Sequence, residues 1–166
     1  MTTQPLSLAV GHEPAPAIIR CLHGPQPERR ARRVVTDVMT ALGITTDLPD
    51  LELVVHELVA NARQHAPGPY ELRIFIGFTS VKIAVLDGGA DHTRVARKLG
   101  QAAGGVLTDG ESGRGLQIVT GLFRCWGAES AATCTGMTPA KQVWVAMPRP
   151  GRDVPGHVRD REAVTG

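Results

Sequence analysis

The chain has 166 residues, 42% of them hydrophobic, and a formal net charge of +2 at pH 7. This length suits one domain with one core, and so small a positive charge gives no reason to expect nucleic-acid binding. No apolar run is long enough to cross a membrane, the first residues lack the pattern of a signal peptide, and the three cysteines lack the spacing of a zinc site. We therefore expect a cytoplasmic protein with reduced thiols.

The N-terminal part predicts a flexible segment followed by a strand and a helix. Residues 1–17 are rich in Pro, Gly, Thr and Ser, and within them only residues 6–10 could form a short strand. The apolar run Ile18–Leu22 predicts a strand. The segment Pro27–Leu42 predicts an amphipathic helix that Gly43 ends.

The outer side of this helix is strongly basic. Four arginines fall on it, namely Arg29, Arg30, Arg32 and Arg33. A run of this kind is usually a solvated face, and the sharper interpretation is a docking surface for an acidic protein partner.

The segment Leu51–His65 predicts a helix that carries polar side chains where a core helix would have none. One face is a continuous apolar arc of Leu51, Val54, Val55, Leu58, Val59 and Ala62. Glu57, Asn61 and His65 follow at i, i+4 and i+8 and form a polar seam along one edge of that arc. A carboxylate beside apolar neighbours is costly unless something binds it, and a hard cation or a proton in transit suits an oxygen pair one turn apart. The alternative is a partly buried helix edge that meets water or an arginine. Asp47 is placed to cap this helix.

Beyond Tyr70 the apolar residues recur at a period of two. Leu72–Phe78 and Val81–Val85 predict two antiparallel strands joined by a short turn. The second strand runs into residues 87–89, an acid followed by two glycines. Such a sequence can grip a planar nitrogen base, because glycines let the backbone approach a ligand closely, although a simple Asp-Gly turn would look the same.

Residues 90–112 lack a strong core pattern and predict a glycine-rich lid with at most a short helix around Leu99. Residues 111–123 then predict a helix whose start is flanked by glycines, and its free amides and positive dipole end would suit a phosphate. This is no Walker loop, which needs Lys where Leu116 stands, and no dinucleotide fingerprint, which needs glycine where Ile118 stands.

The last part of the chain predicts two more strands and a tail. The strands are expected at residues 126–133 and 141–147, with Trp126 and Trp144 in the core. Residues 149–166 are rich in Pro, Gly and charge and predict a disordered tail.

Three motifs stand in order along the chain: a helix with Glu57-x-x-x-Asn61, a strand that ends Asp87-x-Gly89, and Gly113-x-Gly115-Leu116 at a helix start. Together they resemble the ATP-binding GHKL superfamily, which includes gyrase, histidine kinases and MutL. The run Glu-Leu-Val-x-Asn-Ala-x-x-His resembles most closely its short branch, the bacterial anti-sigma factor serine/threonine kinases. The resemblance covers residues 18–148, with the lid at residues 90–112. It implies the Bergerat (histidine-kinase-like ATPase) fold, an α+β two-layer α/β sandwich in which helices cover one face of a mixed, mostly antiparallel sheet.

The resemblance also implies a role for each motif residue. Asn61 would bind Mg²⁺ held by the phosphates of ATP, and Glu57 would be the general base that takes a proton from the attacking hydroxyl. Asp87 would accept a hydrogen bond from the adenine amino group, and Gly89 would leave room for the base. The phosphates would meet the glycine motif and basic side chains, namely Gly113, Arg114, Gly115 and Leu116, with Arg94, Arg97 and Lys98 in the lid.

One position departs from the family pattern. The family often has glycine where Asp91 stands, so the hinge of the lid need not follow the family's, and a carboxylate lies near the phosphates. The first functional expectation is an anti-sigma factor that sequesters a sigma factor and phosphorylates an anti-anti-sigma (STAS-type) protein, and that could form a homodimer. The alternative is an ATP-dependent protein-binding module that regulates transcription without phosphoryl transfer. Neither implies direct contact with nucleic acid or membrane.

Overall fold

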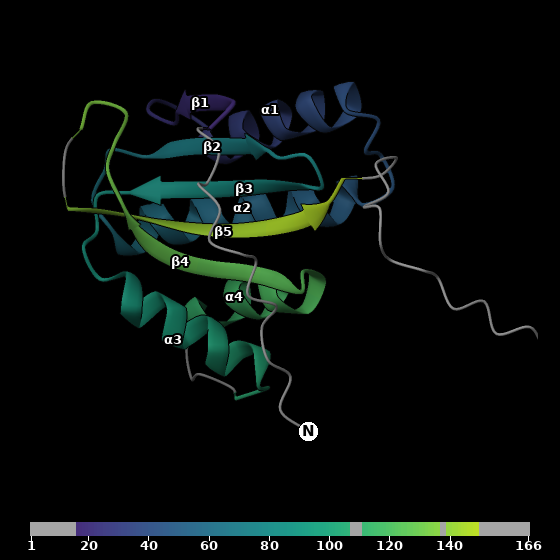
Figure 1. Cartoon of the computed structure of the whole chain (residues 1–166). Coiled ribbons are helices and arrows are strands. Elements are labelled where there is room, and N and C mark those ends of the chain that lie inside the picture. The colour runs from purple at the N-terminus through teal and green to yellow at the C-terminus, as the bar shows by residue number, and fades with distance from the viewer. Residues whose placement is uncertain (1–15, 107–110, 137–138, 150–166) are drawn as a thin grey trace, which may run out of the picture.

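The computed structural model describes residues 16–106, 111–136 and 139–149, which form a two-layer α/β sandwich (Figure 1). The strands are β1 (Ile18–Cys21), β2 (Glu71–Ile76), β3 (Ser80–Asp87), β4 (Cys125–Ala131) and β5 (Ala140–Pro148). The helices are α1 (Pro27–Ala41), α2 (Leu48–His65), α3 (His92–Ala103) and α4 (Glu111–Leu122). The strand expected near residues 6–10 and the tail from residue 150 lie outside the described residues.

The sheet has the strand order β1-β2-β3-β5-β4, and every neighbouring pair is antiparallel. Helices α1, α2 and α4 cover one face of this sheet, and α3 lies beside β4 and packs on α4 (Figure 1). The fold predicted from the sequence is thus confirmed.

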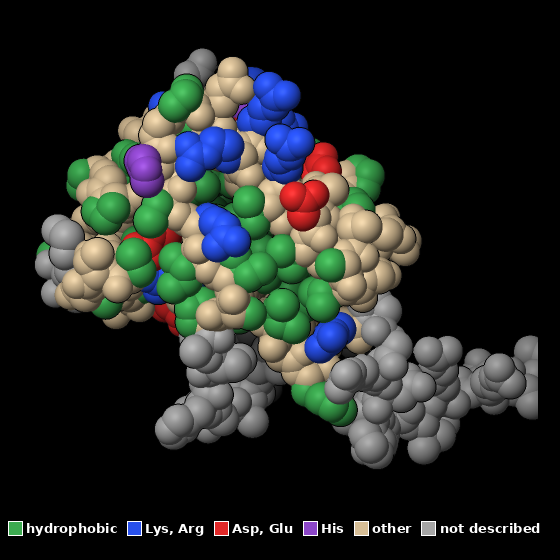
Figure 2. Space-filling model, turned by 90° about the horizontal axis from the view of Figure 1, so that it is seen from above, with side chains coloured by type: hydrophobic (Ala, Val, Ile, Leu, Met, Phe, Trp, Pro, Cys, Tyr) green, Lys and Arg blue, Asp and Glu red, His purple; other side chains and the backbone are tan. Residues whose placement is uncertain are grey.

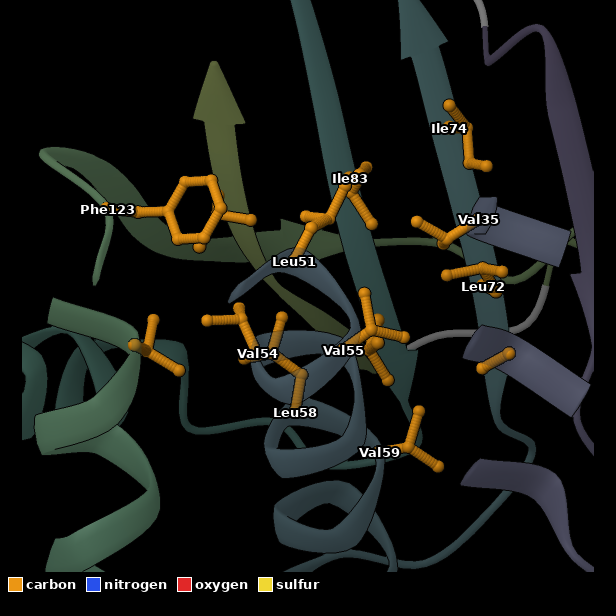
Figure 3. Packing of buried hydrophobic residues seen from close by; sticks show 14 of the residues in the cluster. Val35, Leu51, Val54, Val55, Leu58, Val59, Leu72, Ile74, Ile83 and Phe123 are labelled. Atoms are coloured by element: carbon orange, nitrogen blue, oxygen red, sulfur yellow. The ribbon is translucent and has the colours of Figure 1, made fainter. Parts of the chain in front are cut away.

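Helix α2 is the centre of the core, because its apolar arc faces both the sheet and its neighbouring helices. Val54, Val55 and Val59 are fully buried. Figure 3 shows them between residues of α1, the sheet and the end of α4, among them Val35, Leu72, Ile74, Ile83 and Phe123. Each such aliphatic side chain contributes about 1.5–3 kcal/mol when it is fully buried. This packing fixes the polar seam of α2 in a defined position.

The opposite face of the sheet is partly covered by the loop between β4 and β5. Glu71 and Arg73 form a buried ion pair there at 2.6 Å. Cys134 donates its backbone N–H to Glu71 at 2.8 Å, and Arg73 donates to the carbonyl of Ala132. The side chains on both faces of β2 are therefore buried, whereas an alternating strand usually has one buried and one solvated face.

Several local predictions need correction. Trp144 lies on this second face, against Gly127 and 4.7 Å from the Lys82 ammonium, so only Trp126 packs against the helix-side core. Phe78, expected at the end of a strand, lies instead in the turn after β2, where it is 63% exposed.

Two predictions about helix boundaries also differ from the structure. Asp47 occupies the N-cap position of α2, but its side chain makes no capping hydrogen bond. Within the predicted lid, the 12-residue helix α3 stands where only a short one was expected, and its Leu99 is fully buried. One inward leucine on a basic amphipathic segment is too weak a pattern to reveal this helix from sequence, whereas packing on α4 and β4 supplies the missing contacts.

Candidate functional site

A pocket of about 320 Å³ opens between α2, α3, α4 and the ends of β3 and β5. Its apolar wall comes from Leu58, Ala62, Val85, Ala90, Val95, Leu116 and Val143. Its polar groups come from Asn61, His65, Asp87, Asp91, Arg94, Lys98 and Lys141, with the backbone of Gly89. A concave pocket that combines an apolar wall with convergent polar groups is a usual form of a small-molecule site, and here the polar side chains are as numerous as the apolar ones.

The α2 side of the site brings Glu57 and Asn61 together beneath α4. A Cβ atom at Gly115 would lie 2.6 Å from Glu57 Oε2 and 3.0 Å from Asn61 Nδ2, so a side chain there would displace these two polar groups. Asn61 Nδ2 is buried and has no hydrogen-bond partner among the described residues. Because an unsatisfied buried amide is costly, this atom marks a place where a polar ligand would be favourable.

The β3 side ends in a tight turn around Asp87, which is only 2% exposed. Asp87 Oδ1 accepts the Gly89 N–H at 2.8 Å and also pairs with the Lys141 ammonium. Gly88 donates its N–H to the carbonyl of Pro67 at 2.8 Å, and a Cβ at this position would meet the neighbouring backbone. The two glycines therefore permit a close packing that places a carboxylate at the pocket wall.

The α3 side supplies positive charge. Asp91 caps α3 by accepting the Arg94 N–H at 2.9 Å, and its carboxylate also accepts the Thr93 hydroxyl at 2.9 Å. These hydrogen bonds lower the pKa of Asp91. The carboxylate that departs from the family pattern thus stabilises the helix that holds Arg94 and Lys98 at the pocket.

His65, at the end of the polar seam, faces these cations. Partial desolvation, together with the charges of Lys98, Arg94 and Lys141, lowers the pKa of His65. An excess of positive charge that disfavours a protonated histidine is a setting in which an anionic ligand would bind well.

The predicted site residues fall into three groups. Asn61, Asp87, Gly89 and Leu116 line the pocket. Glu57 and Gly115 lie beside it and contact one another. Gly113 lies in the first turn of α4, and Arg114 is exposed. Of the lid cations, Arg94 and Lys98 line the pocket, whereas Arg97 is exposed and does not.

One pocket residue was missed from the sequence. Lys141 is 7% exposed and points to the same face of β5 as Val143 and Val145, the face that meets the helices. Its Cα partner in β3 is Asp87. A lysine on the inward phase of an otherwise apolar strand is a recognisable signal, because charged groups are rarely buried without a partner.

A family model described as the histidine kinase-like ATPase domain matches residues 25–138. The chain belongs to this family. Among solved structures it is similar to the mycobacterial sensor histidine kinase MprB, with a TM-score of 0.50 and 14% identity, covering 79% of this chain and 96% of that chain. At this identity the likeness concerns the fold alone. No curated protein matches the sequence.

Membership of this family confirms the expected histidine-kinase-like ATPase fold. Across residues 16–106, 111–136 and 139–149, no helix is both long and apolar enough to span a membrane.

Proposed function

We propose that this domain binds Mg·ATP in the pocket and transfers a phosphoryl group to a serine or threonine of a protein partner. The observation that carries the proposal is the unpartnered buried amide of Asn61 beside the Glu57 carboxylate, held together under Gly115. Phosphoryl transfer requires positioning, charge neutralisation and an oriented nucleophile. Asn61 would position the Mg²⁺ that neutralises charge, and Glu57 would orient the hydroxyl.

The residues of the pocket fit such a ligand. The unsatisfied Asn61 amide offers a polar contact, and its carbonyl oxygen is a ligand type that Mg²⁺ prefers. Arg94 and Lys98 offer positive charge to phosphate oxygens. Asp87, at the far wall, offers a carboxylate to an amino group of the base. When bound, Mg·ATP would supply the phosphoryl group and the cation that neutralises its charge.

The role that we assign to Glu57 is that of a general base. Its carboxylate lies one helical turn before Asn61, and would accept the proton of a hydroxyl group that approaches the phosphate end of the pocket. Gly115 keeps this edge of α2 close to α4, so Glu57 is held by backbone packing and not by a flexible loop.

The biological role that we propose is anti-sigma regulation. It is supported by the Glu57–His65 motif, which resembles that of the anti-sigma kinases, and the partners would be a sigma factor and an anti-anti-sigma (STAS-type) protein. The face of the molecule seen from above in Figure 2 carries several Lys and Arg side chains. Helix α1 has the exposed Arg29 and Arg33. Arg30 also serves the fold, because it donates to the carbonyls of Cys21 and His23.

A second candidate function is an ATP-dependent binding module without phosphoryl transfer. The observation that favours it is that Glu57 lies against Gly115 and outside the lining of the pocket. In that case nucleotide would only set the arrangement of α3 and α4 for a partner.

Substitution of Glu57 separates the two functions. If Glu57 is the base, Glu57→Gln keeps nucleotide binding within about threefold and lowers phosphate transfer to the anti-anti-sigma partner by about 100-fold or more. The matched control is Glu52→Gln on the same helix, since Glu52 accepts a hydrogen bond from Thr36 at 2.6 Å and lies outside the pocket lining. Transfer that is undiminished in Glu57→Gln would contradict the assignment of the base, and absence of labelled phosphate on any partner with wild-type protein would favour the binding module.

A further inference from the structure

The base end of the pocket holds a buried ion pair that the general ATP-binding scheme does not require. Lys141 and Asp87 are Cα partners in the β3–β5 ladder and have side chains 9% and 3% exposed. Both line the pocket. A buried ion pair is costly unless its remaining hydrogen-bonding groups are also used, so a pair that faces a pocket is well placed to receive a ligand.

The contacts of this pair leave one donor and one acceptor side by side. Asp87 Oδ1 accepts from both the Lys141 ammonium and the Gly89 N–H. Among the described residues no hydrogen bond reaches Asp87 Oδ2, and Asp87 is the one acceptor that the Lys141 ammonium reaches, although an ammonium can donate three hydrogen bonds. A Cβ at Gly89 would lie 2.6 Å from Lys141 Nζ. Because Gly89 has no side chain, the Lys141 ammonium lies close to the Gly89 backbone in the wall of the pocket.

We propose that Lys141 sets the base specificity of the nucleotide site and makes it accept 6-oxo purines as well as adenine. This inference rests on the proposed binding of a purine nucleotide in the pocket. A carboxylate alone accepts from the 6-amino group of adenine and repels a 6-carbonyl oxygen. An ammonium beside that carboxylate removes the repulsion, because it donates to the oxygen.

The Lys141 donor and the Asp87 acceptor can pair with adenine and with a 6-oxo purine, but the 6-position and N1 of the base exchange their partners between the two. With adenine, Asp87 accepts from the 6-amino group and Lys141 donates to N1. With hypoxanthine or guanine, Lys141 donates to O6 and Asp87 accepts from N1–H. Each arrangement satisfies both members of the buried pair, whereas a site without Lys141 would leave the O6 group of a 6-oxo purine facing a carboxylate.

The test is calorimetric titration of the full chain with Mg·ATP and Mg·ITP, which differ only at the 6-position and N1 of the base. We expect the two dissociation constants of the wild-type protein to lie within about tenfold of each other. Lys141→Met should raise the preference for ATP over ITP by at least about tenfold, the usual scale for one base-discriminating contact. Lys141→Arg, which keeps a cation, should preserve most of the wild-type ratio.

The matched control is Lys82→Met, because Lys82 also lies in the sheet and pairs with an acid, Glu129, at 2.7 Å, but on the face away from the pocket. This variant should leave the ratio unchanged. Wild-type protein that binds ATP more than about 100-fold tighter than ITP overturns the assignment of Lys141 whether or not any variant folds. An unchanged ratio in folded Lys141→Met overturns it as well. Failure of wild-type protein to bind either nucleotide contradicts the proposed function itself, and the assignment of Lys141 with it.

Discussion

Replacing Asn61 by alanine should make the ligand-free protein more stable while it weakens nucleotide binding. The buried Asn61 Nδ2 has no partner among the described residues, and such a group costs about 1–3 kcal/mol. Alanine is also the better helix former, by up to about 0.7 kcal/mol. These gains oppose the loss of side-chain packing, so we expect a net stabilisation of about 1 kcal/mol, or about 3 °C in Tm.

Thermal unfolding with and without Mg·ATP measures both effects. A ligand at 100 times its Kd adds about 2.7 kcal/mol to the stability of wild-type protein, which corresponds to about 8 °C. Asn61→Ala should show a higher Tm without ligand and only a small increase with it. Gln64→Ala, on the exposed side of the same helix, reports the change in helix propensity alone. If Asn61→Ala is less stable than wild type by about 1 kcal/mol or more and yet keeps the full ligand-induced increase in Tm, the Asn61 amide is neither a destabilising group nor a contact of the nucleotide.

Two further predictions concern the acidic side chains of Glu71, on the opposite face of the sheet, and Asp91, at the start of α3. Although burial alone would raise the pKa of Glu71, the Cys134 N–H and the Arg73 guanidinium lower it, so this group stabilises the fold above pH 4.5 and the contribution is lost as the pH falls through its lowered pKa. Glu71→Gln should therefore cost about 3 kcal/mol at pH 7 in urea unfolding, and its difference from wild type should shrink below pH 4.5; a constant difference down to pH 2 would contradict this. Asp91→Ala should speed hydrogen exchange at the start of α3, including the Arg94 amide, while Asp91→Asn should not; equal exchange in both variants would argue against the cap.

The fold could be predicted to a large extent because its elements carry strong periodic patterns. The apolar arc of α2 and the alternation in β2 and β3 identify the element type without tertiary information. Helix α3 is the counterexample, since its stability depends on the N-cap of Asp91 and on the burial of Leu99 against distant elements. The surfaces of α4 and β4 against which α3 packs are not visible in the local sequence.

The site residues that belong to short sequence motifs could be predicted. A site residue that reaches the pocket only through the pairing of two strands could not. Asn61, Asp87 and Gly89 belong to short motifs and do line the pocket. Lys141 reaches the same pocket through the register of β5 against β3, 54 positions along the chain from its partner Asp87. A sequence pattern can mark Lys141 as an unusual inward charge, but only the strand pairing shows which acid it meets.

Asp91, which stands where the resemblance implies glycine, illustrates a second limit of prediction from sequence. From sequence, this carboxylate predicts an altered hinge and repulsion of phosphate. In the structure its oxygen is occupied by the Arg94 N–H and the Thr93 hydroxyl, so its charge is used to hold the first turn of α3. The same helix brings Lys98 to the pocket, which offsets the added negative charge.

We propose that the pocket between α2, α3 and β5 takes up ATP with Mg²⁺ at Asn61. Calorimetric titration of wild-type protein with ATP, once with Mg²⁺ and once with a chelator, tests it most directly. We expect one nucleotide per chain and an affinity that falls at least about tenfold without Mg²⁺, which corresponds to about 1.4 kcal/mol. No heat of binding from correctly folded protein, or an affinity that is the same with and without Mg²⁺, would contradict it.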